Sequence, residues 1–578
     1  MKPETKSCQN CKNNFTVESE DFLFYEKIKV PPPTFCPECR FKRRLMWRNN
    51  RSLYSRVCGL CSKKLVSYMK DDGVPVYCLS CYPSDNWDQF AHAQEVDFSK
   101  SFFEQFKELL QKQPRVAQMV YGSVVNCDYS NSVVDGKNLY LTFSSMSSEN
   151  IFYSENVDKS KDCFDCLSVQ ELSQCSWNVN SEKNYNSHYM YESGSCVDSY
   201  FLFDCTNCSN CFMSSNLRNQ SYYFQNQKLN KETYEAKMVE VSLTKFSNLE
   251  KYKASFKDLI ENSLHKFANI QASQSITGDM ILNSKNIKRS FDIRKSENVS
   301  YSYRTIEAKD IMDCNWILRG ELEYESMTGN GGSYHQIACF MCITCSDISY
   351  SVACKNSSNC FGCVGLKNAQ YCIFNKQYSK EEYFELVDKI KKHMMDVPYI
   401  DTKGRIFRYG EFFPYNLSFF GYNESLAHDS FPLSKEEVLN QGFNWFEERE
   451  RNYKPTIASS DLPDDVSEIN ESILQEVISC PNNGNSLTLC TTAYRIVSDE
   501  LTFCKQKNLS LPRFCPNCRH YERLKYRNPV KLWNRTCMCD KEDHNNHEGK
   551  CKVEFETSYS PDRLEKVYCE KCYQQEVY

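Results

Sequence analysis

Paired cysteines are the residues of this sequence whose spacing most clearly indicates chemistry. Four Cys-x-x-Cys pairs lie within residues 1–97: Cys8/Cys11, Cys36/Cys39, Cys58/Cys61 and Cys78/Cys81. The tight turn within such a pair points both sulfurs at one ion, and two pairs complete the tetrahedral shell of a structural zinc site. The eight cysteines therefore predict two Zn²⁺ ions. The simplest grouping is sequential, although an interleaved grouping fits the same spacing.

The pattern returns near the other end of the chain at a constant displacement, so that positions 36, 48 and 58 recur at 515, 527 and 537. Leu487 stands where the counterpart of Cys8 is expected. We therefore predict Cys480 as the fourth ligand of this site, with Cys504 as its rival. The other cysteines of the second copy are Cys490, Cys515, Cys518, Cys537, Cys569 and Cys572.

An inserted loop in the second copy adds further candidate ligands. Cys537-Met-Cys539 replaces the third pair, and the loop that follows carries His544, His547 and Cys551. These side chains are alternative ligands, or the loop is polar surface. In total we predict about four Zn²⁺ ions. The predicted C-terminal ligands are Cys480, Cys490, Cys515, Cys518, Cys537, Cys539, Cys569 and Cys572, with His544, His547 and Cys551 as less certain members.

A basic helix is expected directly after Cys39, from Arg40 to about Arg51, and it contains no acidic residue. One interpretation is nucleic-acid contact, with cations for phosphate and an indole for stacking. The other is that the arginines offset the net charge of −2 of a zinc ion with four thiolates. Both interpretations stay open. The proposed nucleic-acid contacts are Arg43, Arg44, Trp47, Arg48 and Arg51.

The middle of the chain is repetitive. From about 120 to 228, short runs recur roughly every 11–13 residues, each a polar turn residue followed by alternating aromatic, cysteine or aliphatic residues. This pattern predicts a β-solenoid, whose coils contact only their neighbours. A second array follows at a constant offset, so that Cys211 and Tyr234 recur as Cys360 and Tyr383. The array cysteines are interpreted as buried small thiols in preference to a metal ladder.

These features predict a mainly β protein with some α: two tandem β-solenoid-like arrays with capping helices, flanked by double zinc-ribbon or treble-clef modules. The expected domains are an N-terminal double zinc module (1–97), a first array with capping helices (98–270), a second array with a capping helix (271–397), an aromatic-rich linker module (398–462) and a C-terminal zinc module (463–578). A helix is also expected from about Val466 to Val477.

Composition narrows the class of protein. The chain has 578 residues, 34 cysteines and a net charge of −5, so any nucleic-acid surface must be local. The first residues form no signal peptide, and no long apolar run predicts a membrane span. We therefore expect a cytoplasmic protein with thiols in place of disulfides.

The chain resembles a family of bacterial zinc-ribbon proteins without an established activity. The similarity lies in residues 30–49, 371–383 and 409–414. Members are sometimes labelled CaiB/BaiF-like, which implies a CoA transferase. The sequence shows neither the α/β pattern nor the carboxylate chemistry of that label. The resemblance therefore implies the layout and not a function.

The sequence favours a non-enzymatic zinc-binding scaffold that binds nucleic acid, with RNA or ribonucleoprotein preferred, or a protein partner. One alternative is a metal-dependent enzyme that uses an open C-terminal zinc site. The nine histidines are scattered, however, and no His-Glu-x-x-His, Gly-x-Ser-x-Gly or Gly-rich dinucleotide motif occurs. The other alternative is that the zinc modules are purely structural caps of a protein-binding solenoid.

Overall fold

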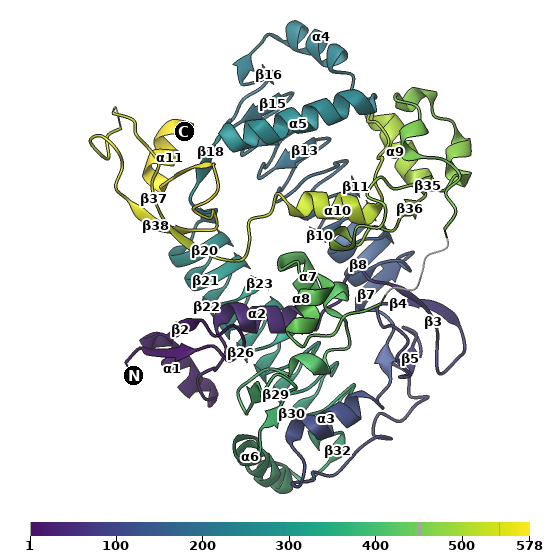
Figure 1. Ribbon diagram of the computed structural model, residues 1–578, viewed down its shortest axis with the longest axis vertical. Helices are drawn as coiled ribbons and strands as arrows, with labels where there is room; N and C mark the ends of the chain where they lie inside the picture. The colour runs from purple at the N-terminus through teal and green to yellow at the C-terminus, as the bar shows by residue number, and fades with distance from the viewer. Residues whose placement is uncertain (1, 448–452, 543) are drawn as a thin grey trace.

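The computed structural model describes residues 2–447, 453–542 and 544–578 (Figure 1). The protein is mainly β, with 31% of residues in strands and 23% in helices. Among the described helices, none is long and apolar enough to cross a membrane.

The first array (array 1) is a stack of short strands. Residues twelve positions apart in the sequence pair with each other in neighbouring layers of the stack. Glu155 pairs in parallel with Leu167, and Tyr200 with Phe212. The recurring sequence unit is therefore one layer of the stack. Its strands are β7 (Val120–Val125), β8 (Asn131–Tyr140), β9 (Phe143–Phe152), β10 (Glu155–Asp158), β11 (Lys161–Phe164), β12 (Leu167–Gln170), β13 (His188–Tyr191), β14 (Tyr200–Phe203), β15 (Phe212–Ser215), β16 (Tyr223–Phe224) and β17 (Gln227–Lys228).

The second array (array 2) has the same parallel register over most of its length, as where Glu297 pairs with Lys309 and Ser346 with Ser358. One layer holds an extra residue, since Glu321 pairs with Tyr334 across Gly331 and Gly332, both at positive φ. Its strands are β19 (Ile270–Gln271), β20 (Gln274–Leu282), β21 (Lys285–Arg294), β22 (Glu297–Ser300), β23 (Tyr303–Ile306), β24 (Lys309–Met312), β25 (Asn315–Leu318), β26 (Glu321–Tyr324), β27 (Met327–Gly329), β28 (Tyr334–Ile337), β29 (Ser346–Ser349), β30 (Ser358–Phe361), β31 (Gln370–Ile373) and β32 (Lys376–Gln377).

A shorter period underlies each layer. Over long stretches of both arrays every third residue has a positive φ, as at Asp162, Asp165 and Ser168. Asn and Asp tolerate this left-handed conformation better than most residues. The residue that follows points into the stack and is small or aliphatic, such as Cys163 and Cys166, both with no exposed surface. Four such corners make one layer around a narrow interior, which the array cysteines share.

Helices follow each array in the sequence. After array 1 come α4 (Lys231–Val241) and α5 (Phe246–Asn262), and after array 2 comes α6 (Lys380–Asp396). Helices α5 and α6 pack against strands near the end of their arrays. The prediction of a helix from Val466 to Val477 is wrong. The chain forms two short 3₁₀ turns there, Val466–Glu468 and Glu471–Gln475. Asp465 and Asn470 accept hydrogen bonds from nearby backbone amides, which favours separate turns over one continuous helix.

Two similar modules hold the terminal cysteines. The N-terminal module contains β1 (Glu4–Ser7), β2 (Asn14–Val17), α1 (Ser19–Ile28), α2 (Pro37–Leu45), β3 (Tyr54–Val57), β4 (Lys64–Ser67) and β5 (Val76–Tyr77). The C-terminal module contains β35 (Ile478–Ser479), β36 (Ala493–Tyr494), α9 (Ser498–Lys507), α10 (Pro516–Leu524), β37 (Trp533–Thr536), β38 (Glu554–Thr557), β39 (Lys566–Tyr568) and α11 (Glu570–Val577). Helices α1 and α2 recur as α9 and α10 at the same displacement that relates the two sets of cysteines.

Each module contacts both arrays. Strand β5 pairs with β6 (Arg115–Val116), which leads into array 1, whereas α2 lies against array 2 (Figure 1). The C-terminal module has the opposite arrangement: β39 pairs with β18 (Leu264–Lys266), which leads into array 2, whereas α10 lies against array 1. We call this arrangement crossed docking.

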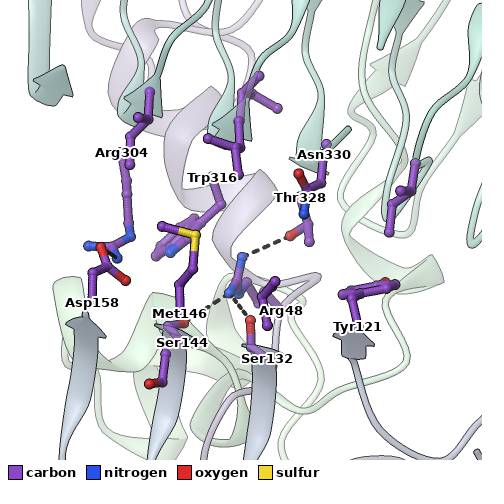
Figure 2. A pocket seen from close by; sticks show the side chains of 17 residues that line it. Arg48, Tyr121, Ser132, Ser144, Met146, Asp158, Arg304, Trp316, Thr328 and Asn330 are labelled. Atoms are coloured by element: carbon purple, nitrogen blue, oxygen red, sulfur yellow. Dashed lines mark hydrogen bonds and ion pairs between the residues drawn. The ribbon is translucent and has the colours of Figure 1, made fainter. Parts of the chain in front are cut away.

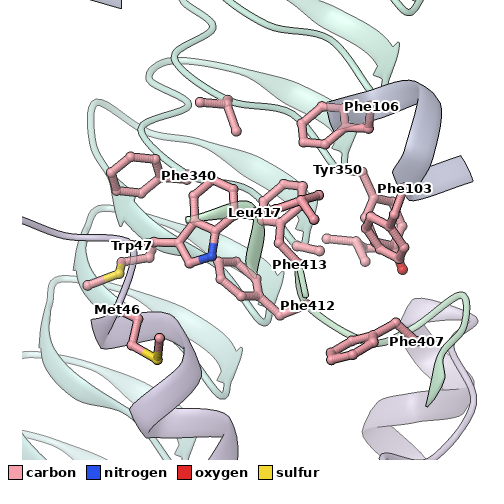
Figure 3. Close-up of a cluster of buried hydrophobic side chains, with 14 of the residues drawn as sticks. Met46, Trp47, Phe103, Phe106, Phe340, Tyr350, Phe407, Phe412, Phe413 and Leu417 are labelled. Atoms are coloured by element: carbon pink, nitrogen blue, oxygen red, sulfur yellow. The ribbon is translucent and has the colours of Figure 1, made fainter. Parts of the chain in front are cut away.

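An aromatic core joins the N-terminal module to array 2 (Figure 3). Trp47 has no exposed surface and contacts Phe340 of array 2, together with Phe412 and Phe413. Helix α3 (Phe102–Leu110) adds Phe106, which stacks on Phe413. The segment expected as an aromatic-rich linker module therefore packs in the largest buried cluster. The segment 398–462 contains β33 (Tyr399–Ile400), β34 (Ile406–Phe407), α7 (Leu426–Ser430) and α8 (Lys435–Asn440).

Candidate metal centres and the buried arginine helices

Four groups of four cysteines each bring their sulfurs within 4.8 Å of one another. A tetrahedron with zinc–sulfur bonds of about 2.3 Å has sulfur–sulfur edges of about 3.8 Å. The sulfur pairs Cys11/Cys36 and Cys61/Cys78 are 3.7 and 3.9 Å apart, which fits this size. The four groups are Cys8/Cys11/Cys36/Cys39, Cys58/Cys61/Cys78/Cys81, Cys480/Cys490/Cys515/Cys518 and Cys537/Cys551/Cys569/Cys572.

The same backbone hydrogen bond recurs in all four groups. In each group, the backbone amide of the third cysteine donates a hydrogen bond to the sulfur of the first cysteine, at 3.2–3.4 Å. The pairs are Cys36 to Cys8, Cys78 to Cys58, Cys515 to Cys480 and Cys569 to Cys537. Side chains add further donors, because Asn10 Nδ2 lies 3.3 Å from the sulfur of Cys39. Burial opposes ionisation of Cys78, but hydrogen bonds from the Ser80 hydroxyl and from backbone amides outweigh it and lower the pKa of Cys78 to about 6. Such bonds favour the thiolate that a metal ion requires.

The structure decides between ligands that the sequence left open. The N-terminal cysteines group sequentially. Cys480 joins the third group with its sulfur 3.8 Å from that of Cys518, whereas Cys504 is buried on α9 outside the group. In the fourth group the partner of Cys537 is Cys551 and not Cys539. Cys537-Met-Cys539 replaces the third pair in the sequence, but in the structure the inserted loop brings Cys551, one of the alternative ligands, to the place that corresponds to Cys61.

Cys539 belongs to a fifth group, with His544, His547 and Cys572. His544 Nδ1 lies 3.3 Å from the sulfur of Cys539, and its Nε2 lies 2.8 Å from a carboxylate oxygen of Glu576. A carboxylate on the far nitrogen is the usual support of a histidine that binds a metal. His547 Nδ1 contacts the carbonyl of Gly549, whereas its buried Nε2 has no partner within the described residues. Cys572 is common to the fourth and fifth groups, so its thiolate could bridge two ions.

The residues expected to contact nucleic acid lie in the interior, and this corrects the prediction. Arg43, Arg44 and Trp47 have no exposed surface, Arg48 is 2% exposed, and the Arg51 side chain is 11% exposed. A phosphate backbone requires cations at the surface. Arg43, Arg44 and Arg51 are paired with carboxylates of the protein, whereas Arg48 donates to hydroxyl groups.

The partners of the N-terminal arginines lie mostly on array 2. Arg40 contacts Asp313 at 2.8 Å, and Arg44 contacts Glu325 at 2.7 Å. Arg43 contacts Glu325 at 2.8 Å, and also contacts Glu411 at 3.0 Å. Burial raises the pKa of Asp313, and the arginines act in the opposite direction. Helix α2 is thus fixed to array 2 by buried ion pairs.

The second copy repeats this contact on the other array. Arg519 and Arg523, the counterparts of Arg40 and Arg44, contact Asp165 at 2.8 and 2.5 Å. Asp165 and Asp313 occupy equivalent places, each directly before an inward cysteine of its array. Sequence reasoning missed both carboxylates, although the shared Asp-Cys step of the two arrays was a signal that pointed to them.

A scan against models of protein families and a search of curated proteins both returned no match for this chain. Its function is therefore inferred from the geometry above.

Proposed function

We propose that this protein is a non-enzymatic zinc-dependent scaffold, in which the two terminal modules hold two β-solenoids side by side. The observation that carries this proposal is the crossed docking, since each module pairs a strand with one array and inserts an arginine helix against the other. The parallel register, which recurs over most of both arrays, supports the solenoid. The sulfur spacing supports zinc as the ion.

The partner that we propose is a protein, bound on the outer surface of the arrays. The sequence argument for nucleic acid depended on Arg43, Arg44 and their neighbours, which are committed to internal ion pairs. The zinc modules then have a purely structural role. This corresponds to the alternative in which they are structural caps of a protein-binding solenoid.

Metal removal tests the scaffold. Structural zinc contributes folding free energy directly. Chelation should therefore release both modules and increase the radius of gyration measured by small-angle X-ray scattering, and restored Zn²⁺ should reverse the change. A metal-free protein with an unchanged scattering curve would contradict the proposal.

Nucleic acid binding is tested separately with labelled RNA and DNA at low and near-physiological salt. We expect no tight, salt-sensitive binding by the zinc-loaded protein. Such binding by the intact fold would restore the nucleic-acid alternative, and its contact residues would have to lie elsewhere on the surface.

The enzyme remains a second candidate because of one observation, the sharing of Cys572 between two groups. If Cys572 served only the fourth group, Cys539, His544 and His547 would leave one position open on the fifth ion, as in catalytic zinc sites. All four donor atoms of the fifth group lie within 4.8 Å of one another, which favours a closed set of ligands.

A further inference from the structure

A cavity lies between the two arrays (Figure 2). Its walls come from β8, β9 and β10 on one side and from β23, β25 and β27 on the other. Arg48, which follows α2, lies in it and contacts both arrays. The volume is about 110 Å³, several times the roughly 10–15 Å³ that one water needs on this measure.

Arg48 differs from the arginines of α2 in having no carboxylate in contact. Within the described part of the chain, it makes no ion pair. The nearby acids are engaged elsewhere, since Asp158 contacts Arg304 at 3.1 Å and Glu155 contacts Arg51 at 3.6 Å. Burial, and then the charge of Arg304, lower the pKa of Arg48 to about 9. Asp158 also lines the cavity, but its carboxylate is paired with Arg304, so the charge of Arg48 has no carboxylate in contact among the described residues.

The partners of Arg48 in the cavity are hydroxyl groups that accept its hydrogen bonds. Arg48 Nη1 donates to Thr328 Oγ1 at 2.9 Å, and Nη2 donates to Ser132 Oγ at 2.5 Å and to Ser144 Oγ at 2.9 Å. Each hydroxyl keeps its own proton to donate. No acceptor for these three protons occurs among the described contacts. Arg48 Nε also donates to Oδ1 of Asn50 at 3.0 Å. Three hydroxyl protons thus converge beside the guanidinium without an acceptor of their own.

The rest of the wall is mainly apolar and selects the body of a ligand. Its aliphatic residues come from both arrays: Val134, Met146, Ile306, Leu318 and Ile343. The ring of Trp316 lies 4.5 Å from the Arg48 guanidinium carbon and covers one side of it. Inorganic phosphate would leave this aliphatic surface without a partner, whereas a carboxylate with a short branched chain satisfies both parts.

We propose that this cavity binds a short-chain aliphatic carboxylate, with its charged group on Arg48 and on the hydroxyls of Ser132, Ser144 and Thr328. The carboxylate supplies the charged partner that Arg48 lacks and the missing acceptors, and its chain lies along the aliphatic wall. Because the donors come from both arrays and from the N-terminal module, the ligand would stabilise their assembly.

Calorimetric titration of the full-length, zinc-loaded protein tests this proposal. The probes are 3-methylbutanoate, its neutral analogue 3-methylbutanamide, and inorganic phosphate. We expect the carboxylate to bind at least tenfold more tightly than either other probe. Arg48→Gln should lose at least tenfold in affinity. Arg527→Gln, at the equivalent place of the second copy, should leave affinity unchanged.

A cavity-filling variant gives an independent readout that keeps Arg48 in place. Val134→Phe should abolish binding of 3-methylbutanoate while zinc content and circular dichroism stay normal. The proposal is overturned if the carboxylate does not bind, if the amide or phosphate binds equally well, or if Val134→Phe binds normally. Should Arg48→Gln fail to fold, Val134→Phe alone decides the outcome.

Discussion

At the scale of single residues, the protein uses one type of side chain in two ways. Cysteines of the modules converge in groups of four with sulfur spacings that fit a metal ion. Cysteines of the arrays lie one after another in narrow interiors, where burial raises the pKa of Cys163 and Cys205 well above the ordinary value. Raised pKa values keep these two thiols neutral, so they behave as small apolar residues.

The shared ligand Cys572 leads to a prediction about metal content. If its thiolate bridges two ions, the protein should hold five Zn²⁺ ions by elemental analysis. His544→Ala should lose one ion, and Cys572→Ser should lose two. Cys504→Ser, which removes a buried cysteine outside the groups, should lose none. Four ions in the wild type, unchanged in His544→Ala, would exclude the bridge.

Glu323 leads to a prediction about pH. It lies inside array 2, burial raises its pKa to about 8, and neither carboxylate oxygen has a hydrogen-bond partner among the described residues. The folded chain therefore keeps a proton that the unfolded chain, with a pKa near 4.5, releases. Stability from this group is present below pH 4.5, falls as pH rises to about 8, and then stays level.

Glu323→Gln should remove the loss of folding stability that the wild-type glutamate causes as the pH rises. We expect a higher melting temperature at pH 8, with a gain of up to about 4 kcal/mol in unfolding free energy, and little change near pH 4.5. Gln336 already occupies the paired place on β28. Glu325→Gln is the contrasting variant, because it weakens the ion pairs with Arg43 and Arg44 and should lower stability at pH 8. A lower melting temperature for Glu323→Gln at pH 8 would refute the assignment.

At the scale of elements, helices α2 and α10 connect the parts of the molecule. Each begins at a cysteine of a metal group and presents arginines along one side to a carboxylate of an array. One end of the helix is thus tied to the metal group, and its side is tied to the array. The basic composition of α2 serves an internal contact.

Removing the carboxylate of this contact should be costly. Asp313→Ala leaves Arg40 and Arg44 buried with too few partners, so we expect a loss of about 3–5 kcal/mol in chemical unfolding. Asp165→Ala should cost a similar amount through Arg519 and Arg523. Glu149→Ala, which breaks an exposed pair with Lys137, should leave the unfolding free energy nearly unchanged, because exposed ion pairs contribute little. Equal effects of Asp313→Ala and Glu149→Ala would show that the buried pairs contribute little.

Most of the local patterns were read from sequence, although the helix expected from Val466 to Val477 was wrong, and contacts between distant segments were not predicted. The Cys-x-x-Cys pairs and the recurring short runs of the arrays are short-range signals. The corner at every third residue was missed because the inward places hold Cys, Ser, Val or Asn, which look irregular as a group. Cys551 was named as an alternative ligand, but its grouping with Cys537 was left open because it lies in an inserted loop. The docking of Arg44 on Glu325 spans 281 residues, and no local pattern encodes such a contact.

At the scale of the whole molecule, crossed docking makes the two halves depend on each other. Each half contributes one array and one module, and each module reaches the array of the other half (Figure 1). The two contacts share equivalent strands and helices, so the molecule has an approximate internal symmetry.

Division of the chain between α5 and β18 tests this dependence. Co-produced fragments 1–263 and 264–578 should purify as one complex, because α2 and α10 each dock on the other fragment. Combined Asp165→Ala and Asp313→Ala substitutions should separate them. Fragments that purify apart without these substitutions would contradict the crossed contacts.

Crossed docking also sets an order of events during protein synthesis. Cys8 and Cys39 lie close together in the sequence, so the first metal group can form soon after its segment leaves the ribosome. The carboxylates that receive Arg43 are made 282 and 368 residues later, a wait of roughly 15 to 70 s at about 5–20 residues per second. Throughout that interval the arginines of the nascent α2 segment lack the carboxylates that pair with them in the finished fold.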